Sequence, residues 1–446
     1  MKKLTKKWQH LLYACAGMGI NMLNLMMGSY LCSALLVGGF GEAALPYQTY
    51  IQHDLVIPAV WAVFAFLAKI LDGIIDIPLA SFTDNLRSRW GNRRPAIAIG
   101  MALLLVAYLL FLIIPHPKGA SILNTIYYGV VLCMFYTCYT LTMVTYYATF
   151  TEIVDNEKAR NYISNVKAVC DIVYFVLGYV VVRILLNGIN IRIVALVVLP
   201  LALTMLIPLF MIKEPSTVHA KRLLEGGDKV TLIQSLRYTL KNKRFMVWML
   251  VYSLMTFGVQ LFLGGINEYF SYTNMSMILV MSCAFAPVPL TLMLYNRILR
   301  KRGFGVAFGY VLLVYSLGMA MIYSVAFLPQ GMLRTVLSAT AGVVCSFAIG
   351  SLFAVAYSVP AQLAAEEKEQ TGVSNSAMYF AVQGLFSGVA SGVATGLVLT
   401  ALKGSEASAS GGMKYLTLIS ALGTFVAMLA LFGLPKSIKN MGKEHN

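Results

Sequence analysis

The chain has 446 residues, of which 59% are apolar and 12% are charged, whereas an ordinary soluble domain is roughly 45–50% apolar and 25% charged. A soluble protein of this composition could not cover its surface with polar groups, but a lipid bilayer solvates apolar side chains. The composition therefore excludes an ordinary soluble protein and predicts an all-α membrane protein, in which the net charge of +16 needs an explanation other than nucleic acid.

Runs of about 20 mainly apolar residues, the length that crosses a bilayer, recur twelve times along the chain. They begin near Trp8, Ile57, Pro95, Ser121, Ile163, Ile191, Phe245, Met275, Val306, Met332, Gly372 and Tyr415. The longest polar stretch separates the first six runs from the last six. We therefore expect an N-terminal six-helix half (1–212), a cytoplasmic linker (213–244) and a C-terminal six-helix half (245–446).

The basic residues indicate the orientation of these spans, because short cytoplasmic loops carry more Lys and Arg than outside loops do. If the N-terminus lies inside, twenty-six of the 34 Lys and Arg fall on inside segments and five on outside loops. This asymmetry predicts that both termini are cytoplasmic in a cell (inner or plasma) membrane. It also explains the basic charge without a nucleic-acid partner.

The second span holds the strongest functional signal, Lys69-Ile-Leu-Asp72-Gly-Ile-Ile-Asp76. The two carboxylates are four residues apart and therefore share one helix face. A charge near the bilayer centre costs at least about 2.5–3.5 kcal/mol unless it is paired or hydrated. Because two carboxylates on one turn suit a bare cation, we predict that Asp72 and Asp76 bind Na⁺ or H⁺. The alternative is an ion pair between Lys69 and Asp72 that holds helices together.

The inner end of the second span carries one acid and four arginines: Asp84, Arg87, Arg89, Arg93 and Arg94. We predict that they form a charge network that latches the cytoplasmic side of the protein during gating. A cluster that is merely solvated is the alternative.

Uncharged donors and aromatic faces in the first and fourth spans suit a polyhydroxylated ligand, because sugars stack on rings and bond through their hydroxyls. These side chains are Asn21 and Asn24 in the first span, and Tyr136, Thr137, Tyr139, Thr140, Thr142, Thr145, Tyr146, Tyr147 and Thr149 in the fourth. Polarity that serves helix packing is the alternative. In the fifth span Lys167 and Asp171 are spaced as a helical pair, for which we expect a structural role. Lys69, Lys167 and Arg183 leave room for an acidic solute.

The eleventh span combines a stripe of small residues with a polar stripe beside it. The small stripe is Gly384, Gly388, Gly392 and Gly396, and the polar stripe is Gln383, Ser387, Ser391 and Thr395. Glycines at this spacing allow close helix packing, so we predict a cavity wall on which Gln383 and Ser387 contact the solute. Hydroxyls that bond back to their own helix are the alternative.

The second span and its loop, Asp72-x₃-Asp76 followed by Arg87-Ser-Arg-Trp-Gly-Asn-Arg-Arg-Pro95, resemble the glycoside–pentoside–hexuronide:cation symporters. These symporters form the melibiose-permease branch of the major facilitator superfamily. Ala377-Met-Tyr-Phe-Ala-Val-Gln-Gly384 and Asp155-Asn-Glu-Lys-Ala-Arg160 look like that family as well. The resemblance implies the major facilitator fold of twelve transmembrane helices in two halves.

The resemblance also implies roles for single residues. It places Asp72 and Asp76 as the cation carboxylates, with Tyr139 and Thr140 close to them. The acids that anchor the sugar in melibiose permease are replaced here by Asn21 and Thr142, and its intramembrane lysine by Gly388. Lys69 is a candidate for that lysine's role of pairing with an aspartate. These departures put galactoside specificity in doubt.

We therefore expect a secondary transporter that couples the symport of a sugar or glycoside to Na⁺ or H⁺ by alternating access. Alternatives are a carrier of a lysolipid or other amphiphile, and a transport-incompetent sensor on the same scaffold. An enzyme is not expected, because no His–Asp–Ser or His/Cys set lies within the spans. We expect no cofactor and no metal beyond a coupling Na⁺, and a monomer whose partners are membrane lipid and a small-molecule solute.

Overall fold

The computed structural model describes residues 4, 6–40, 47–115, 119–153, 157–217, 240–371, 376–403, 412–441 and 443. Within the helices some side chains also lie outside the described part, among them those of Asp76 and Asp84. The chain forms two compact units. The first comprises residues 1–37 and 45–229, and the second comprises residues 38–44 and 230–446.

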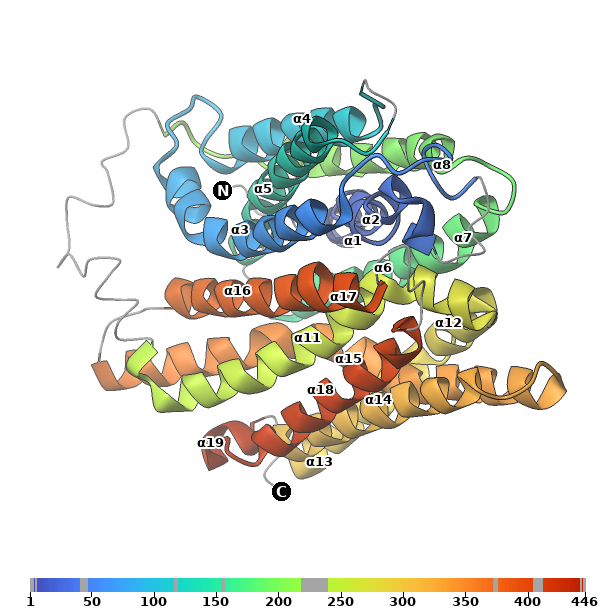
Figure 1. The fold of residues 1–446 in the computed structure, drawn as a ribbon. Coiled ribbons are helices and arrows are strands. Elements are labelled where there is room, and N and C mark those ends of the chain that lie inside the picture. Colours follow the sequence, from blue (N-terminus) through green and yellow to red (C-terminus); the bar gives the residue numbers. More distant parts are fainter. Residues whose placement is uncertain are drawn as a thin grey trace. The chain divides into compact units, whose positions relative to one another are not determined.

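The first unit is a bundle of helices in which α5 packs against both α3 and α4, and α4 and α5 lie side by side in Figure 1. Helices α1 and α2 both contact α6. The elements are α1 (Lys7–Cys15), α2 (Met18–Met26), the π-helix η1 (Met27–Leu31), α3 (Pro58–Asn85), α4 (Arg93–Phe111), α5 (Ile122–Glu152), α6 (Glu157–Val176), the π-helix η4 (Leu177–Val181), α7 (Val182–Leu185), α8 (Ile191–Val198), the 3₁₀ helix η5 (Leu199–Met205) and α9 (Leu206–Met211).

The second unit is also helical, and α14 packs against α15 and α18 while α11 packs against α16 and α18. Its elements, drawn from yellow-green to red in Figure 1, are α11 (Lys243–Thr273), α12 (Met277–Phe285), α13 (Val288–Arg302), α14 (Phe304–Ala326), α15 (Met332–Thr371), α16 (Ser376–Gly392), the π-helix η7 (Val393–Val398), α17 (Leu399–Lys403), the 3₁₀ helix η9 (Met413–Tyr415), α18 (Leu416–Leu431) and α19 (Lys436–Lys439).

Several helices begin where the sequence offers a polar cap. The side chains of Ser121, Asn190, Asn242 and Ser276 each accept a hydrogen bond from a backbone N–H of the first helical turn. These bonds satisfy donors that have no partner within the helix. The caps therefore mark the starts of α5, α8, α11 and α12.

Ten helices in the described part of the chain are long and apolar enough to cross a membrane, and the bent pair α12–α13 makes eleven. The pair bends by 44° beside Pro287, which lacks the N–H that would continue the helix. The helical segment from Glu157 to Leu185 occupies the position of the remaining predicted span, which was expected from Ile163. The twelve predicted spans therefore all coincide with helices.

Large apolar side chains face outward along these helices. Leu103, Val106, Val130, Val197 and Phe210 are 42–74% exposed. Exposed apolar surface on this scale is not stable in water but is solvated by lipid. The interior of the first unit, by contrast, is filled with aromatic side chains, of which Tyr13, Tyr30, Tyr108, Tyr128, Tyr146 and Tyr179 are at most 2% exposed.

Candidate functional site

One face of α5 carries the polar side chains from which the candidate site is built. Tyr136, Tyr139, Thr140 and Tyr147 lie within roughly one third of the helix circumference, because successive residues are about 100° apart. Because α5 packs against α3, side chains on this face can bond to neighbouring helices. Two clusters result, and both lie within the first unit.

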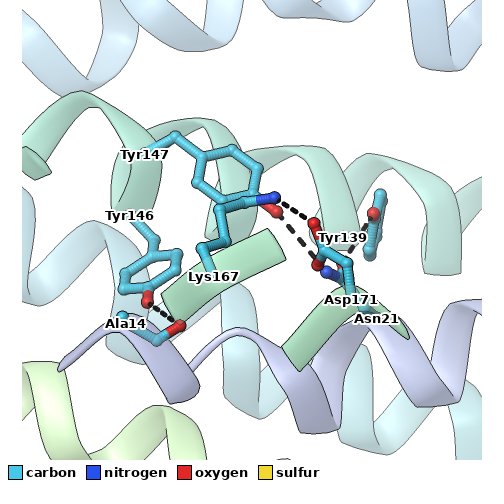
Figure 2. A network of polar contacts seen from close by, with 7 residues as sticks. All are labelled: Ala14, Asn21, Tyr139, Tyr146, Tyr147, Lys167 and Asp171. Atoms are coloured by element: carbon cyan, nitrogen blue, oxygen red, sulfur yellow. Dashed lines mark hydrogen bonds and ion pairs between the residues drawn. The ribbon is translucent and has the colours of Figure 1, made fainter. Parts of the chain in front are cut away.

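The first cluster, here named the α6 cluster, consists of Asn21, Tyr139, Tyr147, Lys167 and Asp171 (Figure 2). The Tyr139 hydroxyl donates to Asn21 Oδ1 at 3.1 Å, and Asn21 Nδ2 lies 3.5 Å from the Tyr147 hydroxyl. Lys167 Nζ donates to Asp171 Oδ2 at 2.6 Å and lies 5.0 Å from the centre of the Tyr147 ring. Helices α2, α5 and α6 thus contribute to one polar network.

The ion pair in the α6 cluster is unusual for a membrane helix. The side chains of Lys167 and Asp171 are 25% and 15% exposed, and Asn21 is 7% exposed. The i, i+4 spacing places lysine and aspartate on the same face of α6. Ionised side chains within a membrane segment are expensive and mark functional sites more often than structural ones. The cluster offers a cation, a carboxylate, an amide and two phenols, which can bind a polar solute.

The second cluster, here named the α3 cluster, consists of Lys69 and Asp72 from α3 and Tyr136 and Thr140 from α5. The Thr140 hydroxyl donates to Asp72 Oδ1 at 2.5 Å. Lys69 Nζ lies 4.0 Å from the centre of the Tyr136 ring. Among the described residues no direct ion pair joins Lys69 to Asp72, although the two charges interact electrostatically. The side chain of Asp76, the second predicted carboxylate, lies outside the described residues.

The two clusters meet at consecutive residues of α5. Tyr139 bonds to Asn21 and Thr140 bonds to Asp72. The family resemblance implied that Tyr139 and Thr140 both lie close to the cation carboxylates. Thr140 has that position, whereas the hydroxyl of Tyr139 belongs to the α6 cluster.

Three other residues predicted to bind solute also lie in the first unit. The Thr142 hydroxyl bonds to Cys138 O at 2.8 Å and is enclosed against Gly100. The Tyr146 hydroxyl donates to the backbone oxygen of Tyr13 and to that of Ala14, which Figure 2 shows. Both hydroxyls therefore bond to backbone oxygens within the bundle. Asn24 is half-buried, and its Oδ1 has no hydrogen-bond partner in the described part of the chain.

The two solute residues predicted on the eleventh span belong to the second unit. Gln383 Oε1 accepts a hydrogen bond of 2.8 Å from Trp248 Nε1. The Ser387 hydroxyl bonds to Gly384 O at 2.9 Å, and Thr395 bonds in the same way to Ser391 O. The hydroxyls of Ser387 and Thr395 thus bond back to their own helix, as the alternative to a cavity wall expects.

The predicted gating arginines lie at the end of α3 and the start of α4. Arg87 and Arg89 are exposed, whereas Arg93 and Arg94 are half-buried. Glu214 Oε2 accepts from the backbone N–H groups of Arg93 and Arg94 at 3.0 and 3.5 Å, and Arg94 Nε donates to Leu209 O at 2.9 Å. Asp84, the predicted acid of this network, has a side chain outside the described residues.

Sequence reasoning counted Tyr136 and Tyr147 among the hydroxyls of the fourth span but gave no site role to Asp171 or Glu214. Asp171 has a recognisable signal, because it lies one helical turn from Lys167. Glu214 has none, since it lies more than 100 residues from the helix start that it caps.

Comparison with known proteins identifies a family to which this architecture corresponds. Residues 12–435 match the family described as MFS/sugar transport protein. An uncharacterized symporter, sll1374 of Synechocystis sp. (strain ATCC 27184 / PCC 6803 / Kazusa), is 31% identical over 134 residues, a match that spans 28% of this chain and only 25% of the relative.

Three solved structures have a similar fold. The nucleoside transporter NupG has a TM-score of 0.62 at 15% identity, with 96% of this chain and 98% of NupG covered. A POT family transporter in complex with a thioalcohol-conjugated peptide has a TM-score of 0.64 at 11% identity, with 96% of each chain covered. A bacterial homolog of the human lysosomal transporter Spinster has a TM-score of 0.62 at 12% identity, with 98% of each covered. At these identities the likeness shows the fold alone.

The match over residues 12–435 covers nearly the whole chain, and the family that it identifies includes the glycoside–pentoside–hexuronide symporters that the second span resembles. The predicted fold class is thereby confirmed. The chain belongs to the MFS/sugar transport protein family and is a multi-pass secondary transporter with the all-helical major facilitator fold.

Proposed function

We propose that this transporter is a symporter that moves a sugar or glycoside together with Na⁺ or H⁺ by alternating access. The cation binds at Asp72 and Thr140 of the α3 cluster, with Asp76 as a second carboxylate. The solute binds at the α6 cluster. The observation that carries the proposal is the pair of hydrogen bonds that consecutive residues of α5 make, from Tyr139 to Asn21 and from Thr140 to Asp72.

The chemistry of the α3 cluster suits a small cation. Asp72 supplies a carboxylate within a membrane helix, and Thr140 adds a hydroxyl oxygen at 2.5 Å from it. A hard cation such as Na⁺ takes oxygen ligands, and a proton binds directly to a carboxylate oxygen. Asp76, one turn along the same face, would complete the set of oxygens.

The chemistry of the α6 cluster suits a neutral, polyhydroxylated solute. Lys167 and Asp171 neutralise each other at 2.6 Å, so that the pair presents donors and acceptors without net charge. The ring of Tyr147 and the hydroxyl of Tyr139 add a stacking face and a further donor or acceptor. A small number of precisely placed polar groups among aromatic side chains is typical of small-molecule sites.

Coupling requires that each ligand bind better when the other is present, by the same factor. Tyr139 and Thr140 are adjacent on one rigid helix, so a shift of α5 that improves the Thr140–Asp72 geometry also moves Tyr139 against Asn21. The proposal therefore assigns the coupling to α5.

The test is uptake by purified protein in proteoliposomes. A panel of radiolabelled glycosides, pentosides and hexuronides is offered with an inward Na⁺ gradient, with an inward proton gradient, and with neither. We expect one gradient to stimulate uptake of at least one sugar by tenfold or more, and Asp72→Asn to remove that stimulation.

A matched control is Ser387→Ala, because among the described residues this hydroxyl bonds within its own helix, and its loss should leave the gradient dependence intact. Uptake of a sugar that neither gradient stimulates would contradict coupling. Uptake of a lysolipid but of no sugar would favour the amphiphile carrier instead.

The orientation is part of the same proposal. The excess of Lys and Arg on alternate loops supports cytoplasmic termini in a cell membrane. In a variant whose seven cysteines are replaced by serine, a cysteine placed at Ser408 should react with a membrane-impermeant maleimide in intact cells, and one at Gly226 should not. The reverse labelling pattern would show that the termini lie outside.

A further inference from the structure

The position of Lys69 is not explained by the proposed cation site alone. Its ammonium group lies over the ring of Tyr136, 4.0 Å from the ring centre, in the cation–π geometry. Asp72 lies three residues further along α3, on the same helix face. A carboxylate is a stronger partner for a partly desolvated ammonium than an aromatic ring is. Lys69 nevertheless rests on the ring.

The surroundings of Asp72 and Tyr136 show how this arrangement is built. Thr140 holds Asp72 Oδ1 at 2.5 Å and so orients the carboxylate toward α5. Tyr136 is only 2% exposed, and its hydroxyl lies close to Gly28 of the first span, where a Cβ would approach to 3.4 Å. The ring of Tyr136 is therefore fixed by packing and offers Lys69 a stable position within reach of Asp72.

Lys69 and the coupling cation have the same charge and the same available partner. When a cation occupies the carboxylate, an ammonium beside it is repelled, and the ring of Tyr136 provides the alternative contact. When no cation is bound, the ammonium of Lys69 can neutralise the carboxylate by a change of side-chain torsion. A long, flexible lysine side chain can make such a change without moving its helix.

We propose that Lys69 is an internal competitor of the coupling cation. The ammonium group of Lys69 rests on Tyr136 while the cation is bound at Asp72, and it moves to Asp72 when the cation leaves. This inference rests on the proposed cation site. In this mechanism Tyr136 is a positioning residue that acts through Lys69. The lysine keeps the carboxylate neutral when the coupling ion is absent, and it lowers the affinity of the site so that the ion can be released.

The experiment measures cation binding directly, so it needs no knowledge of the solute. Purified full-length protein in lipid nanodiscs is titrated with radioactive Na⁺, and proton uptake is followed in parallel, so that either coupling ion is detected. The variants are Lys69→Gln, Tyr136→Leu, Tyr136→Phe and the double variant Lys69→Gln with Tyr136→Leu. Asp72→Asn identifies the part of the binding that belongs to the site.

The four variants have different expected results. Lys69→Gln should tighten cation binding about tenfold, because the competitor is gone. Tyr136→Leu should weaken it about 3- to 30-fold, the range that a partly desolvated cation–π contact sets. Tyr136→Phe keeps the ring but removes the hydroxyl, which also contacts Lys69, so it should weaken cation binding less than Tyr136→Leu does. The double variant should bind like Lys69→Gln alone, because Tyr136 acts only through the lysine.

That last result distinguishes competition from simple structural damage, which would add to the effect of Lys69→Gln in the double variant. If Asp72-dependent binding exists but Lys69→Gln leaves the affinity unchanged or weaker, the inference is overturned while the cation site stands. If no cation binding depends on Asp72, the proposed cation site fails, and the inference fails with it.

Discussion

Helices α5 and α16 carry similar sets of small polar side chains, yet they use them differently. On α5 the hydroxyls of Tyr139 and Thr140 leave the helix and bond to Asn21 and Asp72. On α16 the hydroxyl of Ser387 returns to Gly384 O of its own helix, 2.9 Å away. The composition of a membrane helix therefore does not reveal whether it lines a site, because the outcome depends on what the neighbouring helix presents.

Physical chemistry explains the contrast. A serine or threonine hydroxyl in an apolar environment can satisfy itself on the backbone oxygen one turn earlier, and it needs no tertiary partner. A carboxylate has no such option, because the backbone N–H groups of a helix interior are already used. Asp72 therefore recruits Thr140 from another helix, whereas no carboxylate is recorded as a partner of Ser387 in the described part of α16.

The largest effect is expected from breaking the ion pair of the α6 cluster. Removing one partner of a buried pair costs about 3–5 kcal/mol, because the other charge stays buried, and the partial exposure of Lys167 and Asp171 (25% and 15%) places the cost near the lower limit. Lys167→Met and Asp171→Asn should each lower the unfolding temperature of the purified protein markedly. Thermal unfolding of protein in detergent, followed by tryptophan fluorescence, measures this.

The double variant Lys167→Met with Asp171→Asn separates structure from function. It leaves no unpaired charge, so its unfolding temperature should return close to that of the parent. Solute uptake should remain lost if the pair binds solute. Recovery of both stability and uptake would show that the pair is purely structural, and the contrast between α5 and α16 would then rest on the α3 cluster alone.

The sequence predicted the helices and the polarity of the first, fourth and fifth spans, because apolar length and polar spacing are local properties. It could not predict which helix each hydroxyl contacts. Tyr139 and Thr140 differ by about 100° around α5, and only the docking of α2 and α3 decides that one bonds to Asn21 and the other to Asp72. For the same reason, the enclosure of Thr142 against Gly100 could not be foreseen.

A smaller effect is expected from the two hydroxyls of α5, and it should differ between the two ligands. Thr140→Val removes a hydrogen bond to a carboxylate, which contributes about 1.5–3 kcal/mol, so cation binding should weaken about 10- to 100-fold. Tyr139→Phe removes a neutral hydrogen bond to Asn21, and solute binding should weaken only about 2- to 10-fold.

Radioactive Na⁺ binding, proton uptake and equilibrium binding of the transported sugar measure these affinities. Each variant should affect its own ligand when that ligand is measured alone. If Tyr139→Phe weakened cation binding as strongly as Thr140→Val does, then Tyr139 would belong to the cation site, as the family resemblance implied, and the two clusters would have to be regarded as one.

The smallest effect is expected on α16, from Ser387→Ala. This substitution removes a hydroxyl whose recorded bond is to Gly384 O, and the backbone oxygen keeps its helical partner after the hydroxyl is lost. Sugar affinity and cation affinity should therefore stay within about twofold of the parent. The unfolding temperature should stay within about two degrees, since a satisfied intrahelical bond contributes little net stability. A tenfold loss of sugar affinity with unchanged stability would mean that Ser387 turns from its own helix to the solute during transport. In that case the predicted cavity wall on the eleventh span would be correct, and α16 would resemble α5 in the states of the cycle that bind solute.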